Sequence, residues 1–483
     1  MHLKTELRKS DTGVAIWNQP VYYICMDRLN FREKTGYSFA ALGDSAAYMF
    51  IGTFLMFFLT TVAGLAPAVA GTITAIGAVW NSLFNPVMGY ISDHAMTRWG
   101  RRRPFMFAFA FPLMIAVSLL FTTFDIPYGF KILYYSLGVI IFWTSYTGFF
   151  VPYLALGSEY TQDYNERTVL RSYASFFNLI GSVISMSLPT MMVELMQSRN
   201  ISTQTAWSVT GIFIAAAVFV SIMITVRSAR HKDKYVPQAA EDRQRVSIVK
   251  MFREYFQVLK LKPMKCLLFA SLFFLTAYGM FMSDIVYYCT YNQGMSSGQI
   301  SGILFFRAVI SMTFIPFIAA ICKKTDKRTG LILLIGLSAV LITVEKIAGV
   351  HGTFGMYVFI FCIAIGAAAY WQIMPAIIYD VCEYDQYTTG NQRQGTIVSL
   401  QGLVEAIASG IGTQMLGIIL QLAGFDGAQQ VQSAAALEWI ENCTTFVPAI
   451  FMAASCYALY RYHITKAVFN EIKAELDKKK QQE

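Results

Sequence analysis

Twelve apolar runs, each long enough to cross a lipid bilayer, constrain this 483-residue chain more than any other feature. A transmembrane helix needs about 20 residues to cross a hydrocarbon core of ~30 Å. Only 14% of the residues are charged and 55% are hydrophobic, whereas a soluble globular domain has about 25% charged residues. The sequence therefore predicts an all-α polytopic membrane protein. We expect its twelve transmembrane helices at 37–64, 68–92, 104–124, 131–157, 167–196, 206–226, 265–292, 298–321, 329–348, 354–380, 394–422 and 443–463.

The basic residues between these runs predict the orientation of the chain. Lys and Arg are concentrated in alternate connecting segments, such as 93–103 and 322–328, and they are absent from 65–67 and 423–442. Connecting segments rich in Lys and Arg stay on the cytoplasmic side of a membrane. We therefore expect a multi-pass protein of the cell membrane with both termini in the cytoplasm.

The longest polar segment between the runs divides them into six and six. Residues 316–330 also occupy the place in the second half that residues 85–100 occupy in the first half, which indicates an internal repeat. Carriers built from such parallel halves bind their solute between the halves, near the middle of the membrane. The expected parts are a cytoplasmic N-terminal segment (1–36), an N-terminal six-helix half (37–226), a cytoplasmic linker (227–264), a C-terminal six-helix half (265–463) and a cytoplasmic tail (464–483).

The segment Asn81–Pro104 ends in a tight loop that is crowded with arginine. Gly89 permits close approach of helices, and Gly100 permits the chain to reverse. A carboxylate at the end of the preceding run can accept hydrogen bonds from the loop donors. We expect a cytoplasmic gate formed by Asp93, Arg98, Arg101, Arg102 and Arg103.

Several motifs resemble those of one carrier family. They are G-R-R-R-P-F at 100–105, V-P-Y-L-A-L at 151–156, N-E-R-T at 165–168 and D-V-C-E-Y-D-Q-Y-T-T-G-N-Q-R-Q-G-T-I-V-S-L-Q at 380–401. Over residues 36–465 the chain resembles the glycoside-pentoside-hexuronide:cation symporters of the major facilitator superfamily, which include the melibiose carrier. The resemblance implies the major facilitator fold, with twelve transmembrane helices in two six-helix halves. Glu383 stands where this family usually has Asp, so its acidic pattern is kept only loosely.

Four ionisable residues lie deep within the predicted spans: Asp44, Asp284, Arg307 and Glu405. A charge inside the membrane is costly unless it has a partner or faces a water-filled cavity. Because the four residues come from both halves, we expect them on an aqueous central path, among the solute-binding residues. The alternative is a structural ion pair of Arg307 with Asp284 or Glu405.

Asn81 and Asn85 are four residues apart, so their side chains leave the same helical face. The resemblance places them at the coupling-cation site, where the melibiose carrier family commonly has aspartates. An amide can offer Na⁺ a carbonyl oxygen, but it can neither neutralise the ion nor release a proton. We therefore expect coupling to H⁺ in preference to Na⁺, with Asp44 as the first candidate for the titrating group. Packing between helices is the alternative role for the two amides.

The resemblance also implies a sugar site that this chain keeps only in part. The matching positions are Tyr146, Trp371 and Gln401. The positions that differ from the melibiose carrier are Phe150 for an acid, Leu154 for an aromatic residue, Ala174 or Ser175 for an arginine and Ala406 for a lysine. These differences leave the expected fold unchanged, but they argue against specificity for melibiose.

Aromatic residues cluster on the expected solute path. Aromatic rings stack on the apolar faces of sugars while their polar atoms reach sugar oxygens. The candidates are Tyr48, Trp143, Tyr146, Tyr287, Tyr288, Tyr291, Tyr370 and Trp371, and Phe150 is also among the expected solute-binding residues. Ordinary contact with lipid or with the core is the alternative for each of them.

These observations favour a secondary active transporter that moves a glycoside, oligosaccharide or hexuronide by alternating access, coupled to a cation. The alternatives are a carrier of another amphipathic solute, such as a lysolipid, and a non-transporting membrane sensor on a carrier scaffold. The sequence has no catalytic, nucleotide-binding or metal-ligand motif. We therefore expect no enzymatic activity, no metal, no organic cofactor and no nucleic-acid partner. The expected partners of this monomer are the lipid bilayer and a sugar-conjugate solute.

Overall fold

The computed structural model describes residues 29–93, 95, 97, 99–161, 164–231, 248–349, 352–390 and 393–482. Within these residues, twelve helices are long and apolar enough to cross a membrane, so the predicted number of spans is confirmed. The first half contains α1 (Phe31–Phe57), η1 (Phe58–Val62), α2 (Pro67–Asp93), α3 (Arg103–Leu120), α4 (Tyr128–Glu159), α5 (Tyr164–Gln197), α6 (Thr203–Ser228) and η2 (Ala229–His231). The remainder contains α7 (Ile248–Leu259), α8 (Lys262–Tyr287), η4 (Tyr288–Asn292), α9 (Ser297–Lys324), α10 (Lys327–Ala348), α11 (Gly352–Thr389), α12 (Gln394–Leu422), α13 (Ala434–Thr444), α14 (Phe446–Tyr460) and α15 (Lys466–Gln482).

Several helix ends differ from the sequence-based expectation; α11, for example, continues to Thr389, beyond the expected end at residue 380. The first helix begins earlier than expected because the Asn30 and Glu33 side chains form a capping box, each bonding the other residue's backbone N–H. The twelfth span consists of α13 and α14, which meet at Thr445. Pro448 lacks a backbone N–H, so it cannot bond the carbonyl four residues earlier, and this favours a break there.

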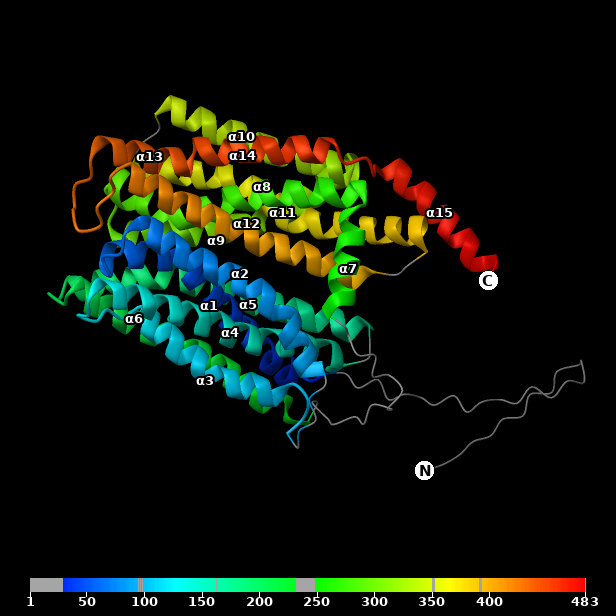
Figure 1. Ribbon diagram of the computed structural model, residues 1–483, viewed down its shortest axis with the longest axis horizontal. Helices are drawn as coiled ribbons and strands as arrows, with labels where there is room; N and C mark the ends of the chain where they lie inside the picture. The colour runs from blue at the N-terminus through cyan, green and yellow to red at the C-terminus, as the bar shows by residue number, and fades with distance from the viewer. Residues whose placement is uncertain are drawn as a thin grey trace, which may run out of the picture.

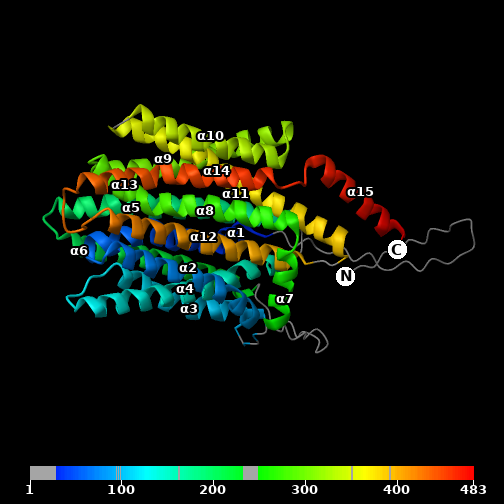
Figure 2. The same ribbon diagram turned by 45° about the horizontal axis from the view of Figure 1, so that its top comes forward.

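The two six-helix halves lie side by side, with α10 and α3 on opposite outer sides of the bundle (Figure 1, Figure 2). We call the end that holds residues 99–103 the arginine end, and the end that holds residues 63–66 and 423–433 the far end. In both views, α7 crosses the arginine end nearly at right angles to the bundle, and α15 projects from that end.

The halves repeat each other in local backbone detail. The first helix of each half ends in a π-helical segment, η1 or η4, which is followed by a glycine with positive φ, Gly64 or Gly294. A proline lies inside the next helix of each half, at Pro86 or Pro316. The distance in sequence from Gly64 to Pro86 equals the distance from Gly294 to Pro316. This correspondence is what a parallel repeat of two halves produces.

The halves approach each other closely toward the far end. A Cβ atom added at Gly417 of α12 would lie 2.4 Å from the Pro67 carbonyl oxygen of α2. At Gly71 of α2, an added Cβ would lie 3.1 Å from the Thr413 carbonyl oxygen of α12. Small residues allow such backbone contact between membrane helices. In Figure 1, α2 and α12 lie together at the far end and diverge toward the arginine end.

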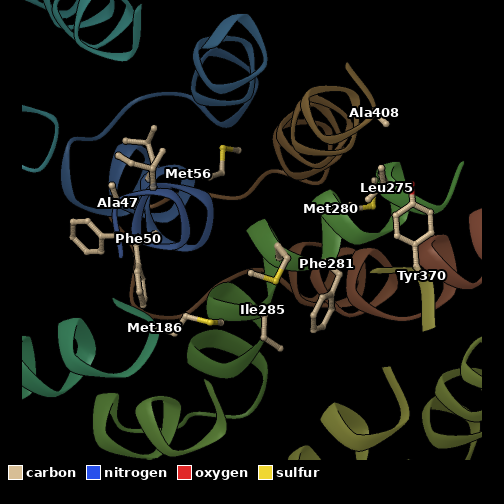
Figure 3. Packing of buried hydrophobic residues seen from close by; sticks show 14 of the residues in the cluster. Ala47, Phe50, Met56, Met186, Leu275, Met280, Phe281, Ile285, Tyr370 and Ala408 are labelled. Atoms are coloured by element: carbon tan, nitrogen blue, oxygen red, sulfur yellow. The ribbon is translucent and has the colours of Figure 1, made fainter. Parts of the chain in front are cut away.

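The buried core contains residues of both halves, such as Phe50 of α1 and Tyr370 of α11 (Figure 3). Phe50 of α1 stacks on Phe121 at a centroid distance of 4.1 Å in the first half. Tyr370 of α11 stacks on Phe274 of α8 at 4.4 Å in the second half. Aromatic packing thus supports α1 in the first half and joins α8 to α11 in the second half.

Replacing Gly417 with alanine should weaken the far-end closure, because the new methyl group would collide with the Pro67 carbonyl. If the collision destabilises the closed far end by ~1 kcal/mol, the population of molecules that are open at this end would rise about fivefold. Labelling of a Thr74→Cys variant by a membrane-impermeant maleimide added at the far end should measure this rise, because the thiol would line the central cavity inside the closure. Gly395→Ala in the same helix is the matched control, since no atom of the described residues lies within 4 Å of its added Cβ. Equal labelling rates in the two variants would contradict the prediction.

Candidate solute-binding site

A central cavity of about 290 Å³ lies between the halves. Its walls come from α1, α2 and α4 of the first half and from α8, α11 and α12 of the second half. The predicted site residues that line it are Tyr48, Asn81, Trp143, Trp371 and Glu405. The structure thus brings together predicted residues that are widely separated in the sequence.

Aromatic rings form the opposing walls of this cavity. Tyr48 meets Trp143 edge-on, with the ring centroids 5.8 Å apart, in the first half. Tyr278 and Trp371 form a similar edge-on pair at 6.5 Å in the second half. Tyr48 is 41% exposed and Trp371 is 50% exposed, so both rings have free surface. Tyr278 was not among the predicted site residues, although it precedes Tyr287 on the same helix.

Asp44 lies just behind the first-half wall and is held by donors from neighbouring helices. The Tyr146 hydroxyl donates to one carboxylate oxygen at 2.5 Å, and the Asn178 amide donates to the other at 3.3 Å. Phe150 stacks on the Tyr146 ring at 5.4 Å. Since Tyr146 is buried in this contact, it orients the acid rather than lining the cavity.

The positive charge of Arg171 on α5 also attracts the negative charge of the ionised Asp44 carboxylate. The sequence comparison with the melibiose carrier placed the fifth-helix arginine position at Ala174 or Ser175 and passed over Arg171. Residues three and four apart share a helical face, so an arginine one turn earlier can serve the same side of α5. Helical spacing was therefore the signal that could have identified Arg171.

The two amides expected at the cation site form a small hydrogen-bonded cluster. Asn81 Oδ1 accepts from the Thr147 hydroxyl at 2.7 Å and from the Asn85 amide at 3.4 Å. The amide oxygen nearest the cavity is thus already engaged by two neutral donors. This arrangement supports packing between α2 and α4, and it leaves little capacity for a bare cation.

Gln401 and Glu405 occupy adjacent turns of α12 in the second half. The buried Gln401 amide nitrogen lies 2.6 Å from the Ser271 hydroxyl and 3.2 Å from a Glu405 carboxylate oxygen. It also lies 3.4 Å from the Tyr370 hydroxyl. Gln401 is therefore a positioning residue for Glu405, which itself faces the cavity.

Arg307 of α9 is buried behind the Tyr278 wall and is only 7% exposed. Its guanidinium donates to the Tyr278 hydroxyl at 3.1 Å and to the Met282 sulfur at 3.1 Å. Its Nε has no hydrogen-bond partner in the part of the chain that the structure describes. Asp284 instead accepts from Thr444 at 2.6 Å. Among the described residues, then, neither Asp284 nor Glu405 forms the alternative ion pair with Arg307.

Three further predicted site residues, all on α8 or η4, do not line the central cavity. Asp284 is fully buried between α8 and α13, and one of its carboxylate oxygens has no hydrogen-bond partner among the described residues. The Tyr287 hydroxyl lies 2.5 Å from the Thr60 hydroxyl and donates to the Met56 carbonyl at 3.0 Å, which joins the halves toward the far end. Tyr288 packs against Phe359 of α11 and accepts from Gln293. Sequence could not separate these residues from the wall residues, because adjacent positions of one helix face different neighbours.

The arginine loop ties helices of the first half together. Arg102 is buried and donates to the Ser92 hydroxyl of α2 at 2.8 Å. Arg103 donates to the Val226 carbonyl at the end of α6 at 2.8 Å. Arg101 is partly buried in the same loop. Arg98 and the Asp93 side chain lie outside the described residues, and a gating role for the loop stays a prediction.

The fold and the cavity between two parallel halves define a transporter of the major facilitator class. The crystal structure of the nucleoside transporter NupG has the same fold, with a TM-score of 0.65 at 11% identity, covering 89% of this chain and 98% of that chain. Residues 36–466 match the family described as "MFS/sugar transport protein", and the chain belongs to this family.

Two curated relatives cover nearly the whole chain. The Glucuronide carrier protein homolog of Escherichia coli (strain K12) is 27% identical over 94% of this chain and 97% of its own length. The Isoprimeverose transporter of Lactiplantibacillus pentosus is 23% identical over 96% and 95%. The family and these relatives are transporters, so the protein is a multi-pass membrane transporter and not an enzyme.

Trp371→Ala should weaken solute binding about tenfold, the effect of losing ~1.4 kcal/mol of ring contact. Because half of the Trp371 surface is exposed, its removal should leave the melting temperature in detergent nearly unchanged. Tyr379→Ala is the control, since Tyr379 is exposed on the same helix but does not line the cavity. Isothermal titration of both variants with a glycoside that the wild type binds should show the difference. Equal affinities of the Trp371→Ala and Tyr379→Ala variants would argue against the aromatic wall.

Proposed function

We propose that this protein is a secondary active transporter that moves a glycoside, oligosaccharide or hexuronide by alternating access, coupled to H⁺. The single observation that carries this proposal is the central cavity, with an aromatic pair on each side and a carboxylate in its wall. Rings bind the apolar faces of a sugar, while Glu405 and the Asn81 amide can bond its hydroxyls. The names of the curated relatives agree with a sugar solute.

The direction of opening follows from charge. We place the arginine end in the cytoplasm, because basic connecting segments stay on that side. The far-end closure would then face the outside, and the helices that diverge toward the arginine end would expose the cavity to the cytoplasm. Alternating access would require the far end to open while the arginine end closes.

Coupling is assigned to Asp44 rather than to the amide cluster. Asp44 is the acid closest to the first-half wall, and its donors Tyr146 and Asn178 come from two other helices. A change in the packing of α4 or α5 would alter those donors, and so would alter how tightly the acid holds a proton. Asn81 and Asn85 carry no charge that could bind or release an ion.

Asp44→Asn should uncouple transport. An asparagine can still accept from Tyr146, so the fold and solute exchange should persist, while accumulation driven by a proton gradient should be lost. Uptake into proteoliposomes with imposed H⁺ and Na⁺ gradients measures this effect. Asp284→Asn is the matched control, because that buried acid lies outside the cavity. Accumulation that survives Asp44→Asn, or that strictly requires Na⁺, would contradict the assignment.

Arg307 favours an anionic member of the solute class. A buried guanidinium without a carboxylate partner is costly, and its two partners, Tyr278 and Met282, both line the cavity. A rotation of the Tyr278 side chain away from Arg307 would expose the guanidinium to a solute bound in the cavity. A carboxylate on that solute would supply the missing counter-charge, which supports the hexuronide option.

A matched pair of solutes tests this preference. p-Nitrophenyl β-D-glucuronide and p-nitrophenyl β-D-glucoside differ only at the carbon that carries the carboxylate. The wild type should prefer the glucuronide by tenfold or more, the effect of ~1.4 kcal/mol. Arg307→Gln should abolish the preference, whereas Arg307→Lys should keep part of it. Transport of both solutes without preference would leave the sugar proposal standing and remove the anionic one, while transport of a lysolipid alone would overturn both.

A further inference from the structure

A second cavity of about 390 Å³ lies at the far end, beyond the closure. We call it the far-end vestibule. A layer formed by Thr60 and Tyr287 separates it from the central cavity, since Met56 lines the central cavity and Phe57 and Thr61 line the vestibule. Its volume falls in the range of about 300 to 1,000 Å³ that is usual for small-molecule sites.

The vestibule is lined by polar groups without charge. Its walls include Thr61, Gln197, Thr290 and Gln430, together with the rings of Trp207 and Tyr291. None of the described residues that line it is an Asp, Glu, Lys, Arg or His. The central cavity, in contrast, has Glu405 in its wall. Hydroxyls and amides beside aromatic rings suit an uncharged, hydroxyl-rich ligand.

Both halves contribute to these walls, and one connecting segment spans them. Thr61, Gln197 and Trp207 belong to the first half, and Thr290 belongs to the second. Residues 427–430 lie between α12 and α13, and they reach across to η1. An added Cβ at Gly427 would lie 2.2 Å from the Thr60 carbonyl oxygen. The vestibule therefore exists in this form only while the far end is closed.

We propose that the far-end vestibule binds the sugar ring of an uncharged glycoside from the outside and that the bound glycoside holds the carrier closed at that end. A ligand that binds one conformation shifts the population toward it. A glycoside at ten times its dissociation constant would reduce opening of the far end about tenfold. The vestibule is thus an inhibitory site, distinct from the transport site. This inference rests on the proposed function, because it assumes a carrier whose far end opens to the outside during each transport cycle.

An efflux assay distinguishes binding in the vestibule from binding at the transport site, because the two change the efflux rate in opposite directions. Right-side-out proteoliposomes are loaded with labelled p-nitrophenyl β-D-glucuronide, and p-nitrophenyl β-D-glucoside is added outside. Occupation of the vestibule should slow efflux, whereas a glucoside entering the transport site from outside would accelerate efflux by exchange. Thr61→Val with Thr290→Val removes one hydroxyl from each half at nearly constant volume and should abolish the slowing. Thr343→Val, on α10 and outside both cavities, should leave it unchanged.

A second measurement does not depend on transport. In the Thr61→Cys variant, external glucoside should slow labelling by a membrane-impermeant maleimide at least fivefold at saturation, since the thiol would lie under the bound ring. Absence of both protection and slowing, or slowing that persists in the double valine variant, overturns the proposal. If no efflux occurs even without glucoside, the proposed function fails instead, and protection of the thiol still reports on the vestibule.

Discussion

The backbone contact between α2 and α12 at the far end is the interaction on which the rest of this structure depends. At Gly417, even a methyl group would collide with the facing carbonyl of Pro67. Lipid provides no hydrophobic force to bring the halves together, so close packing of small residues and hydrogen bonds such as Tyr287 with Thr60 must do so. Because this closure lies beyond the central cavity, it positions the aromatic walls of both halves while the helices diverge toward the arginine end.

The surroundings of the buried charges differ between the halves. Asp44 has two hydrogen-bond donors and a nearby cation, Arg171, all from the first half. Arg307 of the second half has a phenol and a thioether in place of a carboxylate. The satisfied acid suits reversible proton binding that depends on helix packing, whereas the incompletely satisfied cation suits recognition of a solute. The two proposals on coupling and on solute charge both follow from this asymmetry.

The site was harder to predict than the fold. Tyr48, Trp143 and Trp371 were expected near the solute, and they line the central cavity. Tyr287 had the same residue type and an equally suitable place in the sequence, yet it closes the far end. Arg171 was overlooked because a fixed alignment position was compared, whereas a helix presents residues three and four apart on one face. Small rotations of each helix decide such outcomes, and residue type does not report them.

The sequence by itself determined the twelve spans, the two-half organisation and the family, because these depend on local quantities. Apolar length sets whether a helix can cross a membrane, and the motifs at 100–105 and 380–401 are contiguous. Only the tertiary structure decided that Arg307 has no acidic partner among the described residues, that Gln401 positions Glu405, and that a second cavity lies beyond the closure. Each of these depends on distances between helices that are far apart in the chain, and those distances are set by how closely the small residues of α2 and α12 let the halves approach.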